Sequence, residues 1–135
     1  MAVNLGVLPA WLLLLIAPGW RWSQRIASTI MPSLLGLVYL YLFFRQFRTL
    51  GGSFATLALT RIMFAEPGVV LAGWIHFLAF DLIVAAWVAQ DAHRRHLPRM
   101  VMVPCLLVTL AAAPLGLLLY RGLRWARFSQ VWEAE

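Results

Sequence analysis

The sequence contains no lysine, and all 11 of its basic residues are arginines. Without a lysine amine no side chain can form a Schiff base, which excludes retinal-type pigments and lysine-dependent aldolases. Cysteine occurs once, as Cys105, so one chain has neither a disulfide nor a cysteine-based metal site. Acidic residues number only five, so each carboxylate needs a physical explanation.

Long apolar runs dominate the sequence, and 63% of its 135 residues are hydrophobic. Such a composition, with runs of about 20 residues, is typical of bilayer-spanning proteins and not of soluble domains. We therefore predict an all-α integral membrane bundle that forms a single membrane domain, residues 1–135, because the spans leave no room for a second domain. Four transmembrane helices are expected, at about residues 3–17, 26–44, 69–89 and 101–120.

The longest connection, between the second and third spans, predicts a short interfacial helix. Gly51 and Gly52 break the chain, and Ser53 is placed to cap a helix that runs to Phe64. The apolar side chains of this helix share one face with Arg61 near its edge, as in helices that lie in the headgroup layer.

The first span is expected to be retained, because no positive residue precedes it and no small-residue cleavage site follows it.

The arginines occur in short runs between the apolar segments. This pattern is typical of anchors that face anionic headgroups, so membrane lipids are expected partners and nucleic acid is not. With four spans, five arginines would lie on one side and six on the other, which is too even to predict an orientation. The abundance of Ala, Arg, Leu and Trp suggests a bacterial protein, and we expect it in the cytoplasmic (inner) membrane.

Asp81 lies within about two residues of the midpoint of the third span. A charged aspartate at the bilayer centre costs about 2.5–3.5 kcal/mol. We therefore expect a neutral carboxyl, or one that faces a polar partner or a water-filled cavity inside the bundle. The candidate partners lie in the other spans: Asn4, Ser28, Thr29, Ser33, Thr109 and the backbone near Pro114. Intramembrane ionisable residues commonly serve function, but one interhelical hydrogen bond explains Asp81 almost as well.

His76 precedes Asp81 by five positions on the same predicted helix. At about 100° and 1.5 Å per residue, the two side chains point about 140° apart, with Cβ atoms roughly 10 Å apart. They therefore cannot bind one metal ion, whose ligands lie about 2 Å away, and we expect no metal and no cofactor. A long substrate lying across the helix could contact both residues. A structural hydrogen bond explains His76 equally well.

Asp91, at the end of the third span, is followed three and four residues later by Arg94 and Arg95. This spacing predicts an ion pair at the level of the headgroups, which is an anchor and not a catalytic group. Trp74 and Trp87 are either residues of the interfacial aromatic belt or walls of a pocket.

The block that holds these residues reads GWIHFLAFDLIVAAWVAQDAHRRHLPR (73–99) and is followed by PCLLVTLAAAPLGLLLY (104–120). In these blocks, and in the stretches PAWLLLLIAP, GSFATL and IMFAEP, the chain resembles the abscisic-acid-deficient-type membrane proteins. Plastid members of that family are linked to the formation of neoxanthin from violaxanthin, and the family also includes many uncharacterised bacterial proteins. The resemblance extends over most of the chain.

This resemblance implies an isomerisation without net redox change, in which a 5,6-epoxy carotenoid end group becomes an allene. Such a reaction needs an acid to protonate the epoxide oxygen and a base to take a proton from the adjacent polyene carbon. The resemblance makes Asp81 and His76 the candidate catalytic residues. It makes Trp74, Phe80 and Trp87 the candidates for binding the polyene.

Two functional hypotheses follow. In the first, the chain is a small membrane isomerase that acts on a carotenoid or another isoprenoid lipid. In the second, it is a non-catalytic pigment- or lipid-binding accessory subunit whose buried polar residues only orient helices. A transporter is less favoured, because four spans are few and no paired broken helices occur. Either hypothesis allows a homo-oligomer or a membrane-protein partner.

Overall fold

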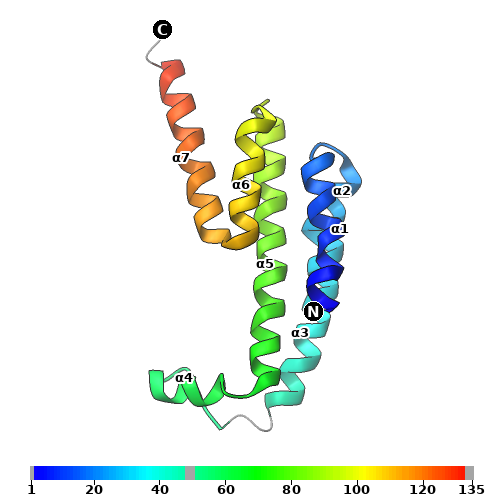
Figure 1. Ribbon diagram of the computed structural model, residues 1–135, viewed down its shortest axis with the longest axis vertical. Helices are drawn as coiled ribbons and strands as arrows, with labels where there is room; N and C mark the ends of the chain where they lie inside the picture. Colours follow the sequence, from blue (N-terminus) through cyan, green and yellow to red (C-terminus); the bar gives the residue numbers. More distant parts are fainter. Residues whose placement is uncertain (1, 48–50, 133–135) are drawn as a thin grey trace.

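The computed structural model describes residues 2–47 and 51–132, and the regular structure of these ranges is helical (Figure 1). The prediction of an all-α fold is therefore confirmed. The helical segments of residues 21–25, 26–30 and 31–47 follow one another without a break, so residues 21–47 form one long helix with a π-helical turn. The elements are α1 (Ala2–Ile16), α2 (Arg21–Arg25), the π-helical segment η1 (Ile26–Ile30), α3 (Met31–Phe47), α4 (Leu57–Met63), α5 (Pro67–Arg94), α6 (Arg99–Ala111) and α7 (Ala113–Trp132).

Helix α5 has 28 residues and is therefore about 42 Å long. It begins at Pro67, where the missing amide proton and fixed φ of proline suit a first helical turn. It ends in a Schellman motif: the Leu97 amide donates to the Ala92 carbonyl at 2.9 Å, and the His96 amide donates to the His93 carbonyl at 3.1 Å. His96 takes the left-handed conformation of this motif, with a φ of 53°.

Small side chains let α5 pack closely against the helix of residues 21–47. The buried residues along one side of α5 recur every three or four positions: Ala72, Ile75, Ala79, Leu82, Ala86 and Ala89. This spacing is that of a coiled-coil seam, and its alanines allow two backbones to approach each other. The helix of residues 21–47 runs beside α5 along its whole length (Figure 1), so we assign the seam to this contact.

A second buried group, Ala85, Val88 and Ala92, lies only in the half of α5 that ends at Arg94. There α1, α6 and α7 also pack against α5 (Figure 1). In the first half of α5, the indole N–H of Trp74 donates to Asn4 Oδ1 of α1 at 2.7 Å. We call this end of the bundle the arginine end, because it carries Arg21, Arg25, Arg94, Arg95, Arg99, Arg121 and Arg124.

The predicted fourth span, residues 101–120, is not one helix. Helix α6 ends at Ala111, Ala112 is extended (φ −160°, ψ 98°), and α7 begins at Ala113. The two helices pack against each other, and α7 runs back toward the arginine end (Figure 1). Pro114 explains the break. Inside a continuous helix its ring would clash with the preceding turn and remove a backbone hydrogen bond, whereas the first turn of α7 accepts it.

Among the described residues, two helices are long and apolar enough to cross a membrane: residues 21–46 and α5. Helices α1 and α6 are apolar but shorter, so the predicted count of four spanning helices is not confirmed. In the most apolar stretches of the two long helices only 22% and 33% of the residues are buried. The core helix of a soluble protein would be mostly buried, whereas these helices present apolar side chains outward over a wide surface.

The short helix predicted between the second and third spans forms as α4, but it begins later than predicted. Thr56 caps it instead of Ser53, because Thr56 Oγ1 accepts a hydrogen bond from the Leu59 amide at 3.3 Å. The carbonyl of Ser53 instead accepts from Thr60 Oγ1 at 3.2 Å, in the turn that leads into α4. Helix α4 lies across the end of α5 opposite the arginine end (Figure 1).

We predict that Gly116→Ala weakens the packing of α7 on α6. An added β-carbon would lie 2.6 Å from the Cα and the backbone N of Thr109, a buried residue of α6. Overpacking of this kind costs about 1–3 kcal/mol, so the thermal unfolding midpoint of the protein in detergent should fall. Gly122→Ala on the same helix is the control, since nothing lies within 4 Å of its added β-carbon. Equal midpoints for the two variants would contradict the hairpin packing.

Candidate functional site

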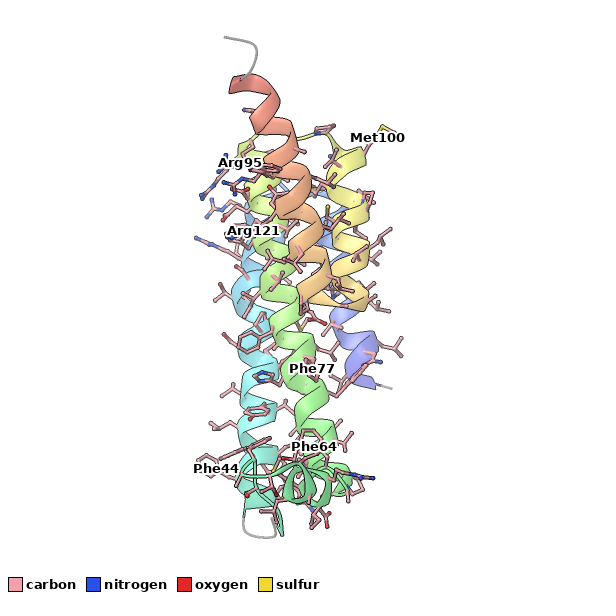
Figure 2. The ribbon with its side chains drawn as sticks, turned by 90° about the vertical axis from the view of Figure 1, so that its left-hand side faces the viewer. Phe44, Phe64, Phe77, Arg95, Met100 and Arg121 are labelled. Carbon is pink, nitrogen blue, oxygen red and sulfur yellow. The ribbon has the colours of Figure 1, made fainter. Side chains whose placement is uncertain are left out.

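A cavity of about 550 Å³ lies between α3, α4 and α5, at the end of the bundle opposite the arginine end. The α6–α7 hairpin stops short of this half of α5 (Figure 1), and α1 reaches it at its own start, where Asn4 accepts a hydrogen bond from Trp74. The space between the two long helices and α4 is therefore not covered by the hairpin. Figure 2 shows Phe64 and Phe77, two of the wall residues, in this part of the bundle. The wall is mostly aromatic or small: Tyr39, Phe43, Gly52, Ser53, Phe54, Met63, Phe64, Val69, Ala72, Gly73, His76 and Phe77.

His76 is held among aromatic rings at the wall of this cavity. Its ring centroid lies 4.6 Å from that of Phe80, one turn further along α5, and 5.7 Å from that of Tyr39 on α3. Phe77 approaches edge-on at 6.2 Å. Within residues 2–47 and 51–132 the imidazole forms no hydrogen bond. Its ring nitrogens are therefore available to form a hydrogen bond with a ligand.

Three wall residues carry exchangeable protons: the phenol of Tyr39, the hydroxyl of Ser53 and the imidazole of His76. An apolar wall with a few polar groups is usual for a small-molecule site. Sequence reasoning did not include Tyr39 among the site residues, because it is far from His76 in the chain. Only the packing of α3 against α5 brings the two rings together.

Asp81 is not among the residues that line this cavity. It is half-buried, and it forms no hydrogen bond or ion pair with any residue that the structure describes. Two of the polar partners that the sequence offers are engaged elsewhere. Asn4 accepts from Trp74, and Thr109 Oγ1 donates to the Cys105 carbonyl at 2.7 Å. The expectation that a polar partner shields Asp81 is therefore not met among the described residues.

Asp81 lies on the face of α5 that points away from α3. At about 100° per residue it points about 180° from Ala72 and about 140° from His76. One and two turns further along the same face, Ala85 and Val88 are buried. Helix α6 has 13 residues, about 20 Å, and folds back along α5 from the arginine end (Figure 1). Asp81 lies 13 residues before the last residue of α5, so the α6–α7 junction is expected at about its level. The carboxyl therefore lies at the border of the region that the hairpin covers.

The three aromatic residues predicted to bind substrate do not share one site. Phe80 lies against the histidine ring at the cavity wall, whereas the indole of Trp74 ties α5 to the start of α1. Trp87 lies nearer the arginine end. Its ring is edge-on to that of Tyr120 at 5.9 Å, and the guanidinium of Arg121 lies 5.8 Å from it. None of the three lines the cavity, and among them Phe80 is the one whose ring packs on the histidine ring at the cavity wall.

Asp91 is the centre of a polar cluster at the arginine end. Its carboxylate accepts hydrogen bonds from Tyr120 Oη at 2.6 Å, Arg95 Nε at 3.0 Å and Arg124 Nη1 at 3.2 Å. The ion pair predicted for Asp91 and its neighbours along the helix forms with Arg95 and not with Arg94. Because Tyr120 and Arg124 belong to α7, this cluster fixes the hairpin to the end of α5.

Metal ligands do not gather in the part of the chain that the structure describes. There, no three His, Cys, Asp or Glu side chains lie close enough together to hold an ion. The His93 ring is close to Gly19 in the turn between α1 and α2, where an added β-carbon would lie 2.5 Å from it. This histidine therefore packs against a turn instead of joining a ligand set.

Comparison with known proteins agrees with the resemblance inferred from the sequence. The family model described as ABA DEFICIENT 4-like matches residues 1–120. This range includes the cavity and both Asp91 and Tyr120, whereas Arg121 and Arg124 lie beyond it. No curated protein and no solved structure matches the chain.

We predict opposite outcomes for the two aspartates of α5. Asp91→Asn removes the charge that binds Tyr120 and two arginines, and because these ion pairs are partly exposed, stability should fall by roughly 1–2 kcal/mol. Asp81→Asn should not destabilise the protein, because Asp81 has no partner among the described residues. Thermal unfolding of both variants in the same detergent measures this. A larger loss for Asp81→Asn would show that Asp81 carries a bond this structure lacks.

Proposed function

The chain belongs to the ABA DEFICIENT 4-like family, and from this premise we propose that it is an integral membrane protein that binds a carotenoid or another isoprenoid lipid and isomerises it by proton transfer. The end group of the ligand occupies the cavity between α3, α4 and α5. One observation carries the proposal: the imidazole of His76 lies at the wall of an otherwise largely apolar, aromatic cavity.

Membrane embedding is supported by the two long helices with their exposed apolar side chains. At about 42 Å, α5 exceeds the hydrocarbon thickness of about 30 Å. Seven of the arginines whose side chains are described lie at the arginine end, and Arg45 and Arg61 lie at the other. Because arginines concentrate on the cytoplasmic side, we assign the arginine end to the cytoplasm and the chain to a bacterial cytoplasmic membrane. The even division of arginines that four spans would give does not occur, because the hairpin returns α7 with its arginines to the arginine end.

An isoprenoid ligand is supported by the size and the walls of the cavity. Its volume of about 550 Å³ falls in the range of about 300–1,000 Å³ that small-molecule sites occupy. The aromatic rings of Phe43, Phe64 and Phe77 offer faces for a polyene. Phe54 and Phe77 line the cavity and are themselves exposed, so the cavity is open and a ligand can enter it from the lipid layer.

In the proposed reaction a base takes a proton from the polyene carbon next to a 5,6-epoxide. A second double bond forms, the bond between the oxygen and the neighbouring ring carbon breaks, and the oxygen receives a proton. No electrons enter or leave the ligand. His76 suits the base, because a neutral imidazole nitrogen can accept a proton, and the Tyr39 phenol, whose ring lies 5.7 Å away, suits the acid. For a ligand long enough to lie across α5, Asp81 is the alternative acid.

A second candidate function, a non-catalytic pigment- or lipid-binding subunit, is favoured by one specific observation. Asp81 does not line the cavity, so the pair of His76 and Asp81 expected of an isomerase is not assembled at its wall. A protein of this kind would hold the same ligand in the same place without converting it.

Expression in a carotenoid-producing host tests the proposed reaction. The wild type should yield a new carotenoid isomer in the pigment profile. His76→Gln should lower its amount by about a hundredfold or more, as expected for loss of a general base, while pigment still co-purifies with the protein. Asp81→Asn should retain conversion if Tyr39 is the acid, because Asp81 lies outside the cavity, and should lose conversion if Asp81 is the acid.

A matched pair of glycine variants tests the cavity itself. Gly73→Leu places a large side chain in the wall and should remove both bound pigment and conversion. Gly36→Leu on α3 should change neither, because its surroundings are open. Pigment bound without conversion in the wild type would support the accessory subunit. Conversion that survives both Gly73→Leu and His76→Gln would exclude the cavity as the site.

A further inference from the structure

A separate pocket of about 350 Å³ lies at the arginine end, where the turn between α1 and α2 meets the end of α5. Helices α2 and α5 both contribute to it, so it is assembled by the fold and not by one helix. Its wall has a basic and polar character that the cavity at His76 lacks. The polar wall residues include Arg21, Gln24, Arg25, Ser28, Gln90 and Arg94.

The positive charge of this pocket is not neutralised by the described residues. No aspartate or glutamate is among its wall residues, and its three arginines form no ion pair within the described parts of the chain. The neighbouring Arg95 and Arg124 differ, because the Asp91 carboxylate binds both. Among the described residues of the arginine end, Asp91 therefore neutralises the charge of Arg95 and Arg124, whereas the arginines of the pocket keep their charge.

Two of the arginines are positioned by an aromatic ring. The guanidinium groups of Arg21 and Arg25 lie 6.0 and 5.5 Å from the centre of the Trp22 ring. Such cation–π contacts orient a guanidinium and leave its N–H donors available at the edge. Trp20 and Trp22 are themselves exposed, as is usual for tryptophans at the headgroup layer.

Hydrogen bonds hold the wall of the pocket in place. Gln24 Nε2 donates to the Pro18 carbonyl at 2.8 Å, which fixes the turn between α1 and α2. Ser28 Oγ, in the π-helical segment η1, donates to the Gln24 carbonyl of α2 at 2.6 Å. The turn also contacts α5, because Gly19 lies against the His93 ring. These contacts fix the backbone that carries the arginines, so the pocket is formed without a ligand.

We propose that this pocket binds a phosphate or diphosphate group, carried by a lipid headgroup or free in solution. The planar forks of arginine match the oxygens of phosphate and form strong charge-assisted hydrogen bonds with them. Three unneutralised guanidinium groups balance the charge of a phosphate dianion or a diphosphate. The lipid source rests on the proposed membrane embedding, which places this pocket at the headgroups, whereas the free phosphate source does not.

Calorimetric titration of the purified full chain in a neutral detergent tests this site. The two probes are inorganic diphosphate and a short-chain phosphatidic acid. Arg25→Gln combined with Arg94→Gln should lower the affinity for each probe that binds the wild type by about tenfold or more. The reason is that each lost arginine removes a charge-assisted hydrogen bond. Arg45→Gln combined with Arg61→Gln removes the same charge at the opposite end and should change affinity by less than about twofold.

Ser28→Phe separates a shaped pocket from diffuse positive charge. It fills the pocket while leaving every arginine in place, so it should also weaken binding by about tenfold. If the double arginine variant does not fold, Ser28→Phe alone shows whether the pocket binds the probes. Unfolding midpoints report whether each variant is folded.

The pattern of binding identifies the source of the phosphate. Binding of phosphatidic acid alone indicates a lipid headgroup, binding of diphosphate alone indicates a soluble ligand, and mutual displacement indicates recognition of the phosphate group itself. The proposal is overturned if neither probe binds the wild type, if both arginine pairs weaken binding equally, or if Ser28→Phe binds as the wild type does. No carotenoid is present in the titration, so its outcome is independent of the isomerase proposal.

Discussion

Close packing of α5 against the helix of residues 21–47 is the interaction on which the rest of the structure depends. In a bilayer, apolar side chains gain little by leaving the lipid, so helices associate through contacts between small residues. The buried seam that includes Ala72, Ala79 and Ala86 supplies such contacts along α5 from Ala72 to Ala89. The two helices therefore stay together in the half that the hairpin does not reach, and the cavity beside His76 lies in that half.

The two ends of α5 differ in chemistry, and the hairpin is the cause. Pro114 prevents residues 101–120 from continuing as one helix, so α7 returns, and Tyr120 and Arg124 reach Asp91. The arginines thereby collect at one end, while the other end keeps an apolar cavity with a single imidazole. Twenty residues of α5 separate Gly73 from His93, about 30 Å, so an isoprenoid in the cavity and a phosphate in the basic pocket would occupy independent sites.

Apolar runs are enough to predict both long helices, because each is a continuous apolar stretch bounded by proline, glycine or arginine. They do not predict the hairpin, because a kinked span and a helical hairpin have the same composition and differ only in the backbone of Ala112. His76 stands out in the sequence as a polar residue in an apolar run. Tyr39 and Tyr120 do not, because they meet His76 and Asp91 only through the packing of helices far apart in the chain.

Cysteine labelling tests most directly whether only the two long helices cross the membrane while the hairpin returns to the arginine end. In a Cys105→Ala background, Met100→Cys, Trp125→Cys and Phe54→Cys each place one thiol at an exposed position. A membrane-impermeant maleimide is then applied to sealed vesicles of known orientation. Met100→Cys and Trp125→Cys should react from the same side, and Phe54→Cys from the other. Reaction of the first two from opposite sides would mean that residues 101–120 cross the membrane, and would contradict the structure.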